Sequence, residues 1–309
     1  MSKISKLLRS FWLLFNWQRV LVYPYAFLVG KPRRIHNPSK FGLPYEDVIL
    51  TTKDKLKLHC YLIRYTGDLQ SERARGTVIL FHGNGISHGD VLGHANLLYR
   101  RKFNVFTLEY RGYGLNDGTP SEKGLCLDSQ AAVDYILADP ELSKLPIIAF
   151  GQSLGGAVAI HTAYANKDKI SALIIENTFT SIPDIVKGWP ILRHIAFLCT
   201  QGWWSIDKIA RLPPKLPILM LSGARDRVIP ARHMKELWVA SETRGKLKLK
   251  YGSVESLSDD EDELKKKESK NLFKGFPWGG HDDTCRQPQY WQSVFDFLDD
   301  VFGSHRRFK

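Results

Sequence analysis

Residues 146–156 read PIIAFGQSLGG, and this stretch is the strongest indication of the fold in the sequence. The run 146–150 is apolar, as is typical of a strand buried in a parallel sheet. It leads directly into Gly151-Gln-Ser153-Leu-Gly155, a G-x-S-x-G sequence that opens a predicted helix over about 155–166. A turn of this kind strains the backbone of its serine and needs neighbours without side chains, so that the hydroxyl points out of the sheet. We therefore expect Ser153 to be a catalytic nucleophile.

From residue 47 onward the chain alternates between apolar runs and helical patterns. An antiparallel pair of strands is predicted first, at 47–52 and 56–65. The other predicted strands are at 77–81, 104–108, 146–150, 172–175, 218–221 and, as a last or edge strand, 247–251. Helices are predicted at about 90–101, 122–138, 155–166, 231–241 and 290–301. This alternation predicts a mostly parallel, doubly wound α/β sheet in one domain over 41–309.

Two segments fall outside the alternation. Residues 178–212 are rich in aromatic residues and prolines, and we expect them to form a short helical cap above the sheet. Residues 252–270 contain seven acids and four lysines with few apolar residues. This composition favours a solvated surface insertion, with a regulatory acidic docking loop as the alternative.

A serine hydroxyl needs a base to accept its proton and a third group to orient that base. In this type of fold the chain order is serine, acid, histidine. Asp226 follows the apolar run 218–221 within SGARDRVIP, and His281 lies in WGGHDDT just before the last predicted helix. Catalytic groups of open α/β sheets gather at such strand ends. We expect Asp226 and His281 to complete the triad, with Glu176 as the alternative acid.

The negative oxygen that develops during acyl transfer needs fixed hydrogen-bond donors. One expected donor is the backbone N–H of Leu154, directly after the nucleophile. The other is expected from HGNG after the strand 77–81, at the backbone N–H of Asn84, with Gly85 as the alternative. His82 in the same loop is expected to be structural.

The sequence favours neither a metal nor a cofactor. His88, His94 and Asp90 do not have the spacing of a metal motif, and we expect them to be solvated or capping residues. The four cysteines lie far apart without a C-x-x-C pair, which predicts separate free thiols.

The positive charge of the chain is concentrated at its N-terminus. The formal net charge is +12, but residues 1–40 contain eight basic residues and no acidic one, so 36 basic and 32 acidic residues remain in the rest. A nucleic-acid-binding domain would carry a basic face within its folded part. The sequence therefore argues against a nucleic-acid partner.

Residues 11–30 read FWLLFNWQRVLVYPYAFLVG, of which fifteen are aliphatic or aromatic. This length suits a membrane-spanning anchor helix within a basic segment 1–40. An interfacial amphipathic helix, a cleaved signal or a helix packed on the domain are the alternatives. Basic residues flank both sides, so the sequence does not decide the orientation.

Five ordered strings, HGNG, EYRGYGLNDGTPSEKG, GQSLGG, SGARDRVIP and GGHDDT, together resemble membrane-anchored serine esterases with the α/β-hydrolase fold. The chain is similar over about residues 47–301 to the fungal bud-emergence (Bem-type) family, which is related to animal abhydrolase-domain proteins. The resemblance implies a triad of Ser153, Asp226 and His281. Asn116 stands where we would expect a serine in relatives, and this difference leaves the triad intact.

The resemblance implies a membrane-associated hydrolase of acyl esters or thioesters that needs no cofactor. We expect a lipid esterase or lysophospholipase, or a palmitoyl-protein hydrolase, with a lipid or an acylated protein as substrate and endomembranes as the favoured location. An acyltransferase or peptidase on the same fold, or a non-catalytic membrane scaffold, are the alternatives. The oligomeric state is left open.

Overall fold

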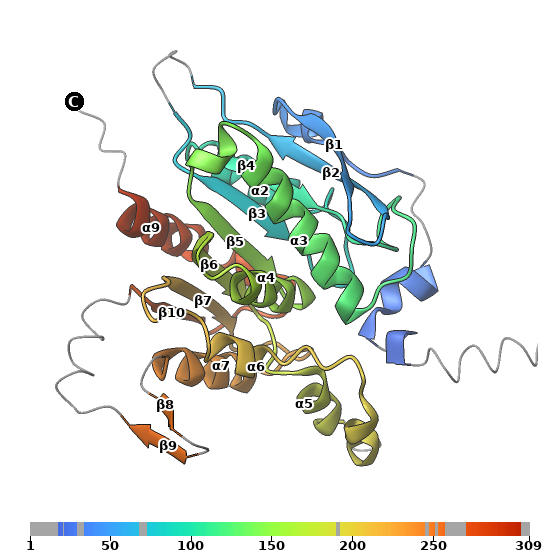
Figure 1. The fold of residues 1–309 in the computed structure, drawn as a ribbon, viewed down its shortest axis with the longest axis vertical. Coiled ribbons are helices and arrows are strands. Elements are labelled where there is room, and N and C mark those ends of the chain that lie inside the picture. Colours follow the sequence, from blue (N-terminus) through green and yellow to red (C-terminus); the bar gives the residue numbers. More distant parts are fainter. Residues whose placement is uncertain are drawn as a thin grey trace, which may run out of the picture.

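A computed structural model describes residues 18–20, 22–29, 34–67, 73–189, 192–244, 247–250, 253–256 and 270–303 (Figure 1). Its main sheet has eight strands in the order β1-β2-β4-β3-β5-β6-β7-β10. The strands are β1 (Glu46–Thr51), β2 (Lys57–Ile63), β3 (Thr77–Phe81), β4 (Asn104–Leu108), β5 (Ile147–Gln152), β6 (Ile170–Glu176), β7 (Ile218–Gly223) and β10 (Leu272–Phe276). The pairs β1–β2 and β2–β4 are antiparallel and the others parallel, which confirms the predicted mostly parallel α/β sheet.

Helices cover both faces of the sheet (Figure 1). The α-helices are α2 (Leu92–Tyr99), α3 (Glu122–Ala138), α4 (Leu154–Ala165), α5 (Ile182–Lys187), α6 (Ser205–Ile209), α7 (Arg232–Glu242) and α9 (Tyr290–Phe302). The shorter helical turns are η1 (Tyr25–Val29), η2 (Pro38–Phe41), η3 (Leu142–Lys144), η4 (Leu192–Leu198) and η5 (Thr284–Arg286). Serine side chains cap the starts of α3 and α5. At α3, for example, the Ser121 hydroxyl accepts a hydrogen bond from the Gly124 backbone N–H.

The core lies on both sides of the central strands. In β3, Val78 and Leu80 pack with α2 and α9, whereas Ile79 and Phe81 pack with α3 and α4. All five residues of this strand are buried. Successive strand side chains point to opposite faces, so a strand covered on both sides is apolar throughout. This explains why the continuous apolar runs predict the central strands.

The end of the sheet differs from the prediction. The predicted last or edge strand 247–251 forms β8 (Leu247–Lys250), which pairs antiparallel with β9 (Ser253–Ser256) in a separate two-stranded sheet. The edge of the main sheet is instead β10, which runs parallel to β7. The strand β9 falls within the predicted surface insertion 252–270, so that part of the insertion is a strand rather than a loop. Of the rest, only Lys270, which is exposed, is among the described residues.

The described part of the predicted anchor 11–30 packs on the domain. Val22 is 8% exposed and Tyr23 is 0% exposed, and both belong to the core on the α3 and α4 side. Among the described residues, no helix combines the length and the apolar character needed to cross a bilayer. Residues 11–17 lie outside the described residues. For 22–27, a segment packed on the domain is therefore the alternative that fits.

Candidate active site

Ser153 lies on the sharp turn between β5 and α4, as predicted. Its φ of 55° and ψ of −121° place it in a backbone region that side-chain-bearing residues rarely adopt. Its backbone N–H donates to the carbonyl of Glu176 at 2.9 Å, which ties the turn to the end of β6. A methyl group added at Gly155 would run into the backbone carbonyl oxygen of Phe81. The surrounding backbone thus requires glycine two residues after the strained serine.

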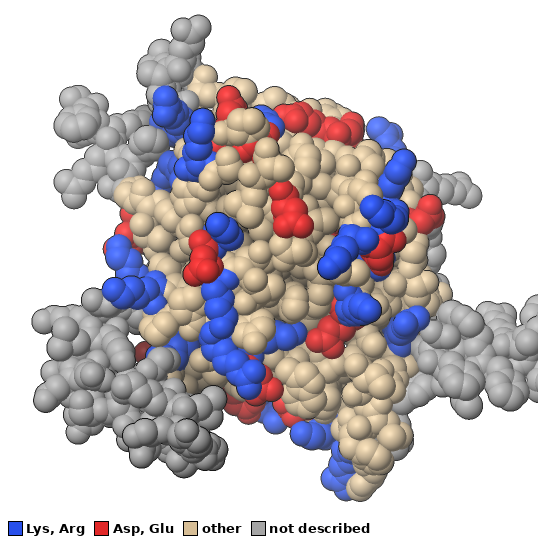
Figure 2. Space-filling model, viewed as in Figure 1, with Lys and Arg blue, Asp and Glu red and all other residues tan. Residues whose placement is uncertain are grey.

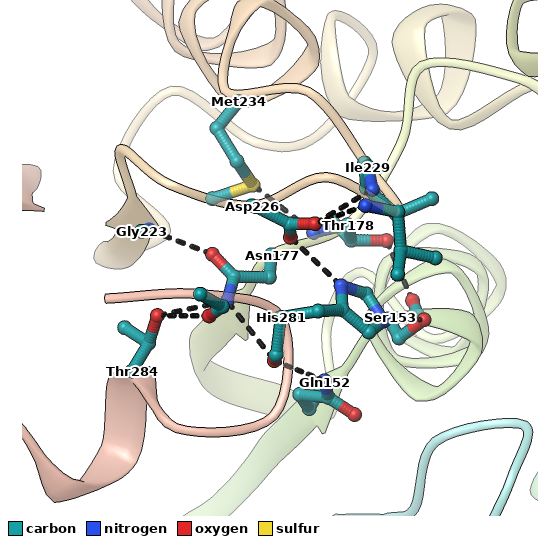
Figure 3. Close-up of polar contacts among 12 residues, drawn as sticks. Gln152, Ser153, Asn177, Thr178, Gly223, Asp226, Ile229, Met234, His281 and Thr284 are labelled. Carbon is teal, nitrogen blue, oxygen red and sulfur yellow. Dashed lines mark hydrogen bonds and ion pairs between the residues drawn. The ribbon is translucent and has the colours of Figure 1, made fainter. Parts of the chain in front are cut away.

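The structure brings Ser153, His281 and Asp226 together, although they come from three separate loops (Figure 3). His281 Nε2 lies 2.9 Å from Ser153 Oγ, and His281 Nδ1 lies 2.7 Å from Asp226 Oδ2. The other carboxylate oxygen of Asp226 accepts the backbone N–H groups of Val228 and Ile229, both at 2.8 Å. A continuous hydrogen-bonded chain therefore runs from a fixed carboxylate through the imidazole to the hydroxyl.

The alternative acid Glu176 has a different partner. Its carboxyl accepts the hydroxyl of Tyr290 at 2.5 Å and lies in the core, where burial raises its pKa to about 7. Asp226, not Glu176, is therefore the carboxylate bonded to the imidazole. In the loop that carries His281, Asp283 accepts the backbone N–H of Gly280 at 2.6 Å, which shapes the turn before His281.

Two side-chain amides hold the loop between β10 and η5 that carries His281, called the histidine loop here. The motifs in the sequence do not single out either amide. Asn177 follows β6 with a φ of +43°. Its Nδ2 donates to the carbonyls of Gly280 and His281 at 3.0 and 3.2 Å, while its Oδ1 accepts the backbone N–H of Gly223. Gln152 Nε2 donates to the same His281 carbonyl at 3.0 Å (Figure 3). The position of Asn177, a polar residue directly after a buried strand, is the one signal that could have found it.

The predicted oxyanion donors border the same pocket as Ser153. Leu154 is the first residue of α4, so its N–H is at a helix N-terminus, and Asn84 is in the loop after β3. The Asn84 side chain is fixed, because Nδ2 donates to the carbonyl of Val22 at 2.8 Å and Oδ1 accepts the hydroxyl of Tyr113. The donation of the two backbone N–H groups to an oxyanion stays a prediction.

His82, which begins the same loop, is buried and structural in its contacts. Its Nε2 lies 2.8 Å from a carboxylate oxygen of Glu109, which is itself buried. The Tyr110 hydroxyl donates to the His82 carbonyl at 3.1 Å. His82 therefore supports the loop after β3 from its buried side and does not line the pocket that contains Ser153. Within the described ranges, no group of three or more His, Cys, Asp or Glu residues is arranged to hold a metal ion.

The pocket around Ser153 has a volume of about 470 Å³, within the range of small-molecule sites. Its walls are mainly apolar. The segment 178–189, at the start of the predicted cap, supplies Phe179, Ile182, Ile185, Val186 and Trp189. Other apolar lining residues are Val22, Pro24, Ile86, Val228 and Ile229.

Basic and acidic side chains are interspersed over the face shown in Figure 2, so this face has no extended basic patch.

Comparisons with known proteins identify the fold. A family model described as serine aminopeptidase, S33 matches residues 72–206. The esterase Pf2001 of Pyrococcus furiosus has a TM-score of 0.64 at 20% identity, covering 88% of this chain and 97% of that chain. An α/β hydrolase of Vibrio vulnificus has a TM-score of 0.67 at 18% identity, covering 92% and 93%. At this identity the likeness shows the fold, which is that of the α/β hydrolases.

Sequence relatives define the family. Protein bem46 of Schizosaccharomyces pombe is 38% identical over 306 residues, covering 96% of this chain and 91% of that protein. The α/β hydrolase domain-containing protein WAV2 of Arabidopsis thaliana is 33% identical, covering 96% and 92%. A protein of Saccharomyces cerevisiae named as an uncharacterized membrane protein is 32% identical, covering 92% and 90%. The fold, the serine turn and these relatives together show that the chain belongs to the Bem46-type family of α/β hydrolases.

Proposed function

We propose that the protein is a serine hydrolase that cleaves acyl esters or thioesters. Ser153 attacks the carbonyl carbon while His281 Nε2 accepts the hydroxyl proton, and His281 then gives this proton to the leaving group. Asp226 keeps the imidazole in the tautomer that presents Nε2 as the base. Water attacks the acyl-enzyme in a second round of the same proton transfers. The observation that carries this proposal is the hydrogen-bonded chain of 2.7 and 2.9 Å between the three side chains.

The oxyanion of each tetrahedral intermediate is bound by the backbone N–H groups of Leu154 and Asn84. Donors of this kind contribute a factor of about 10² to 10³ in turnover each, because they are oriented before the reaction begins. The placement of both residues at the pocket that contains Ser153 supports this assignment.

The substrates are long-chain acyl compounds: lysophospholipids, monoacylglycerols or S-acylated proteins. The apolar walls of the pocket support this class, because a long acyl chain is bound by burial of apolar surface. Apolar side chains also lie outside the pocket on the η4 segment, where Phe197 is 82% and Leu198 is 49% exposed. Together with the apolar sequence at residues 11–17, they support association with membranes. Endomembranes are the location that we propose.

Labelling with a fluorophosphonate probe tests the nucleophile. Wild type should be labelled and Ser153→Ala should not, while the matched control Ser39→Ala, at an exposed position, should be labelled as wild type. Loss of the nucleophile should lower turnover of an ester by about 10⁶-fold. Labelling or ester hydrolysis that persists in Ser153→Ala would refute Ser153 as the nucleophile. A wild type that is neither labelled nor active on any ester would refute the hydrolase and would favour a non-catalytic role of the fold.

The substrate class needs a separate experiment. We expect kcat/KM for p-nitrophenyl esters and acyl thioesters to rise from short to long acyl chains. Activity confined to the shortest esters would refute the long-chain class while leaving the nucleophile intact.

A peptidase is the second candidate, because the matching family model is described as a serine aminopeptidase. A peptidase cleaves amides through the same three side chains, and its specificity depends on the pocket rather than on the triad. Amino-acid p-nitroanilides cleaved faster than long-chain esters would favour this candidate. Turnover on esters alone would exclude it.

A further inference from the structure

We propose that the N-terminal segment, defined here as the described residues 18–20 and 22–25, is part of the active site. This inference rests on the proposed hydrolase function. The carbonyl of Val22 and the hydroxyl of Tyr113 position the loop 82–85 after β3, which supplies the second oxyanion donor, through the side chain of Asn84. The side chains of Val22 and Pro24 form one wall of the acyl pocket and help to set the chain length that it accepts.

The N-terminal segment is bonded into the domain at both of its ends. Gln18 donates from Nε2 to the carbonyl of Leu198 at 2.6 Å and accepts the backbone N–H of Thr200 at 2.6 Å. The hydroxyl of Tyr23, which is fully buried, accepts the indole N–H of Trp203 at 2.9 Å. These contacts lock the segment against residues 198–203, which continue the predicted cap. The position of Val22 between these anchor points is therefore fixed.

The Asn84 side chain uses both of its polar atoms on this arrangement. Its Nδ2 donates to the Val22 carbonyl at 2.8 Å, and its Oδ1 accepts the Tyr113 hydroxyl. The Tyr113 ring is stacked on Tyr25, with centroids 5.9 Å apart and planes at 9°. Burial raises the pKa of Tyr113 well above its ordinary value, so the phenol stays protonated and donates to Asn84.

Fixing the side chain of Asn84 from two directions also restricts the backbone to which it is attached. Preorganised donors stabilise a transition state because they need not reorient during the reaction. A looser Asn84 would thus reduce turnover more than it reduces binding. Val22 and Tyr113 are positioning residues in this scheme, because they act on the reacting atoms through Asn84.

The same segment shapes the space for the acyl chain. Val22 and Pro24 border the cavity of about 470 Å³ together with Ile182, Val186 and Trp189 of the opposite chain segment 178–189. Val22 is 8% exposed, so a larger side chain at this position has little room to turn toward solvent. A tryptophan there would shorten the pocket without touching Ser153, His281 or Asp226.

Two substitutions in the full-length protein test these two parts. Tyr113→Phe removes one donor to Asn84 and keeps the stacked ring, so we expect kcat for a short p-nitrophenyl ester to fall about tenfold with KM nearly unchanged. Fluorophosphonate labelling should slow by a similar factor. The matched control Tyr99→Phe removes a hydroxyl that pairs with the surface residue Thr66, and its kcat should equal that of wild type.

Val22→Trp should lower kcat/KM for a twelve-carbon ester at least about tenfold relative to a four-carbon ester. Its labelling by a small fluorophosphonate should fall less than its turnover of the twelve-carbon ester. The control Val239→Trp, at an exposed position of α7, should leave the chain-length preference unchanged. If Ser153→Ala is inactive while both Tyr113→Phe and Val22→Trp behave as wild type, this inference is wrong and the hydrolase function stands. An active Ser153→Ala would instead refute Ser153 as the nucleophile, and a wild type inactive on every ester would overturn the function on which the inference rests.

Discussion

Replacing Glu176 with glutamine should make the protein more stable at alkaline pH and remove one source of its pH dependence. Burial raises the pKa of this carboxyl from 4.5 to about 7. The folded state therefore keeps the proton over a pH range in which the unfolded chain has lost it. The resulting stabilisation is complete below about pH 4.5 and is lost as the pH rises through about 7. A difference of this size corresponds to about 3 kcal/mol.

Glutamine cannot ionise, and its side-chain oxygen still accepts the Tyr290 hydroxyl that bonds to Glu176 at 2.5 Å. The free energy of unfolding of Glu176→Gln minus that of wild type should thus increase by about 3 kcal/mol between about pH 4 and pH 8. Urea denaturation across this range measures it. The control Glu236→Gln, at an exposed position of α7, should give a constant difference. A difference for Glu176→Gln that is equally constant would refute the reasoning.

Three other predictions have defined outcomes. Asp226→Asn should lower kcat for a short ester by about 10⁴, because the amide does not hold the imidazole in the required tautomer; steady-state kinetics within tenfold of wild type would contradict this. Gly155→Ala should lower the free energy of unfolding by more than about 3 kcal/mol, because the added methyl group meets backbone atoms. Gly93→Ala has open space in α2 and should raise the free energy of unfolding by up to about 1 kcal/mol. Thermal melts that rank the two variants in the reverse order would contradict this. Arg111→Met leaves Asp128 buried and without the ion pair of 2.7 Å, so denaturation should show a loss of about 3 to 5 kcal/mol, part of which Asp128→Asn restores; a double variant no more stable than Arg111→Met would argue against the pair.

The central part of the fold is readable from the sequence because strands covered on both faces are apolar without interruption. The prediction of a strand at 77–81 and of a helix at 122–138 matches β3 and α3 in both bounds. The edge strand β10 has no such pattern. Only Phe276 of its five residues is buried, and Lys274 and Gly275 interrupt the run, so neither periodicity nor composition marks it as a strand.

The same contrast applies to the site. The meeting of Ser153, Asp226 and His281 could be predicted because their residue types, their order and their places after strands are typical of one proposed chemistry. The contributions of Asn177 and Val22 could not be predicted, since an asparagine side chain or a backbone carbonyl occurs in many roles. Asn177 meets Gly280 across 103 positions of the chain, and Asn84 meets Val22 across 62. Only the folded backbone brings such pairs together.

The bonds of Asn177 bear on how substrates reach the pocket. The side-chain amide of Asn177 accepts the backbone N–H of Gly223 in β7 and donates to the carbonyls of Gly280 and His281. An outward swing of the loop that carries His281 would therefore break two part-buried hydrogen bonds at once. We expect this side of the pocket entrance to stay in place when a substrate binds. Trp189 and Val228 also line the pocket and are 41% and 56% exposed. We therefore expect substrates to enter past these exposed side chains, without a movement of the loop that carries His281.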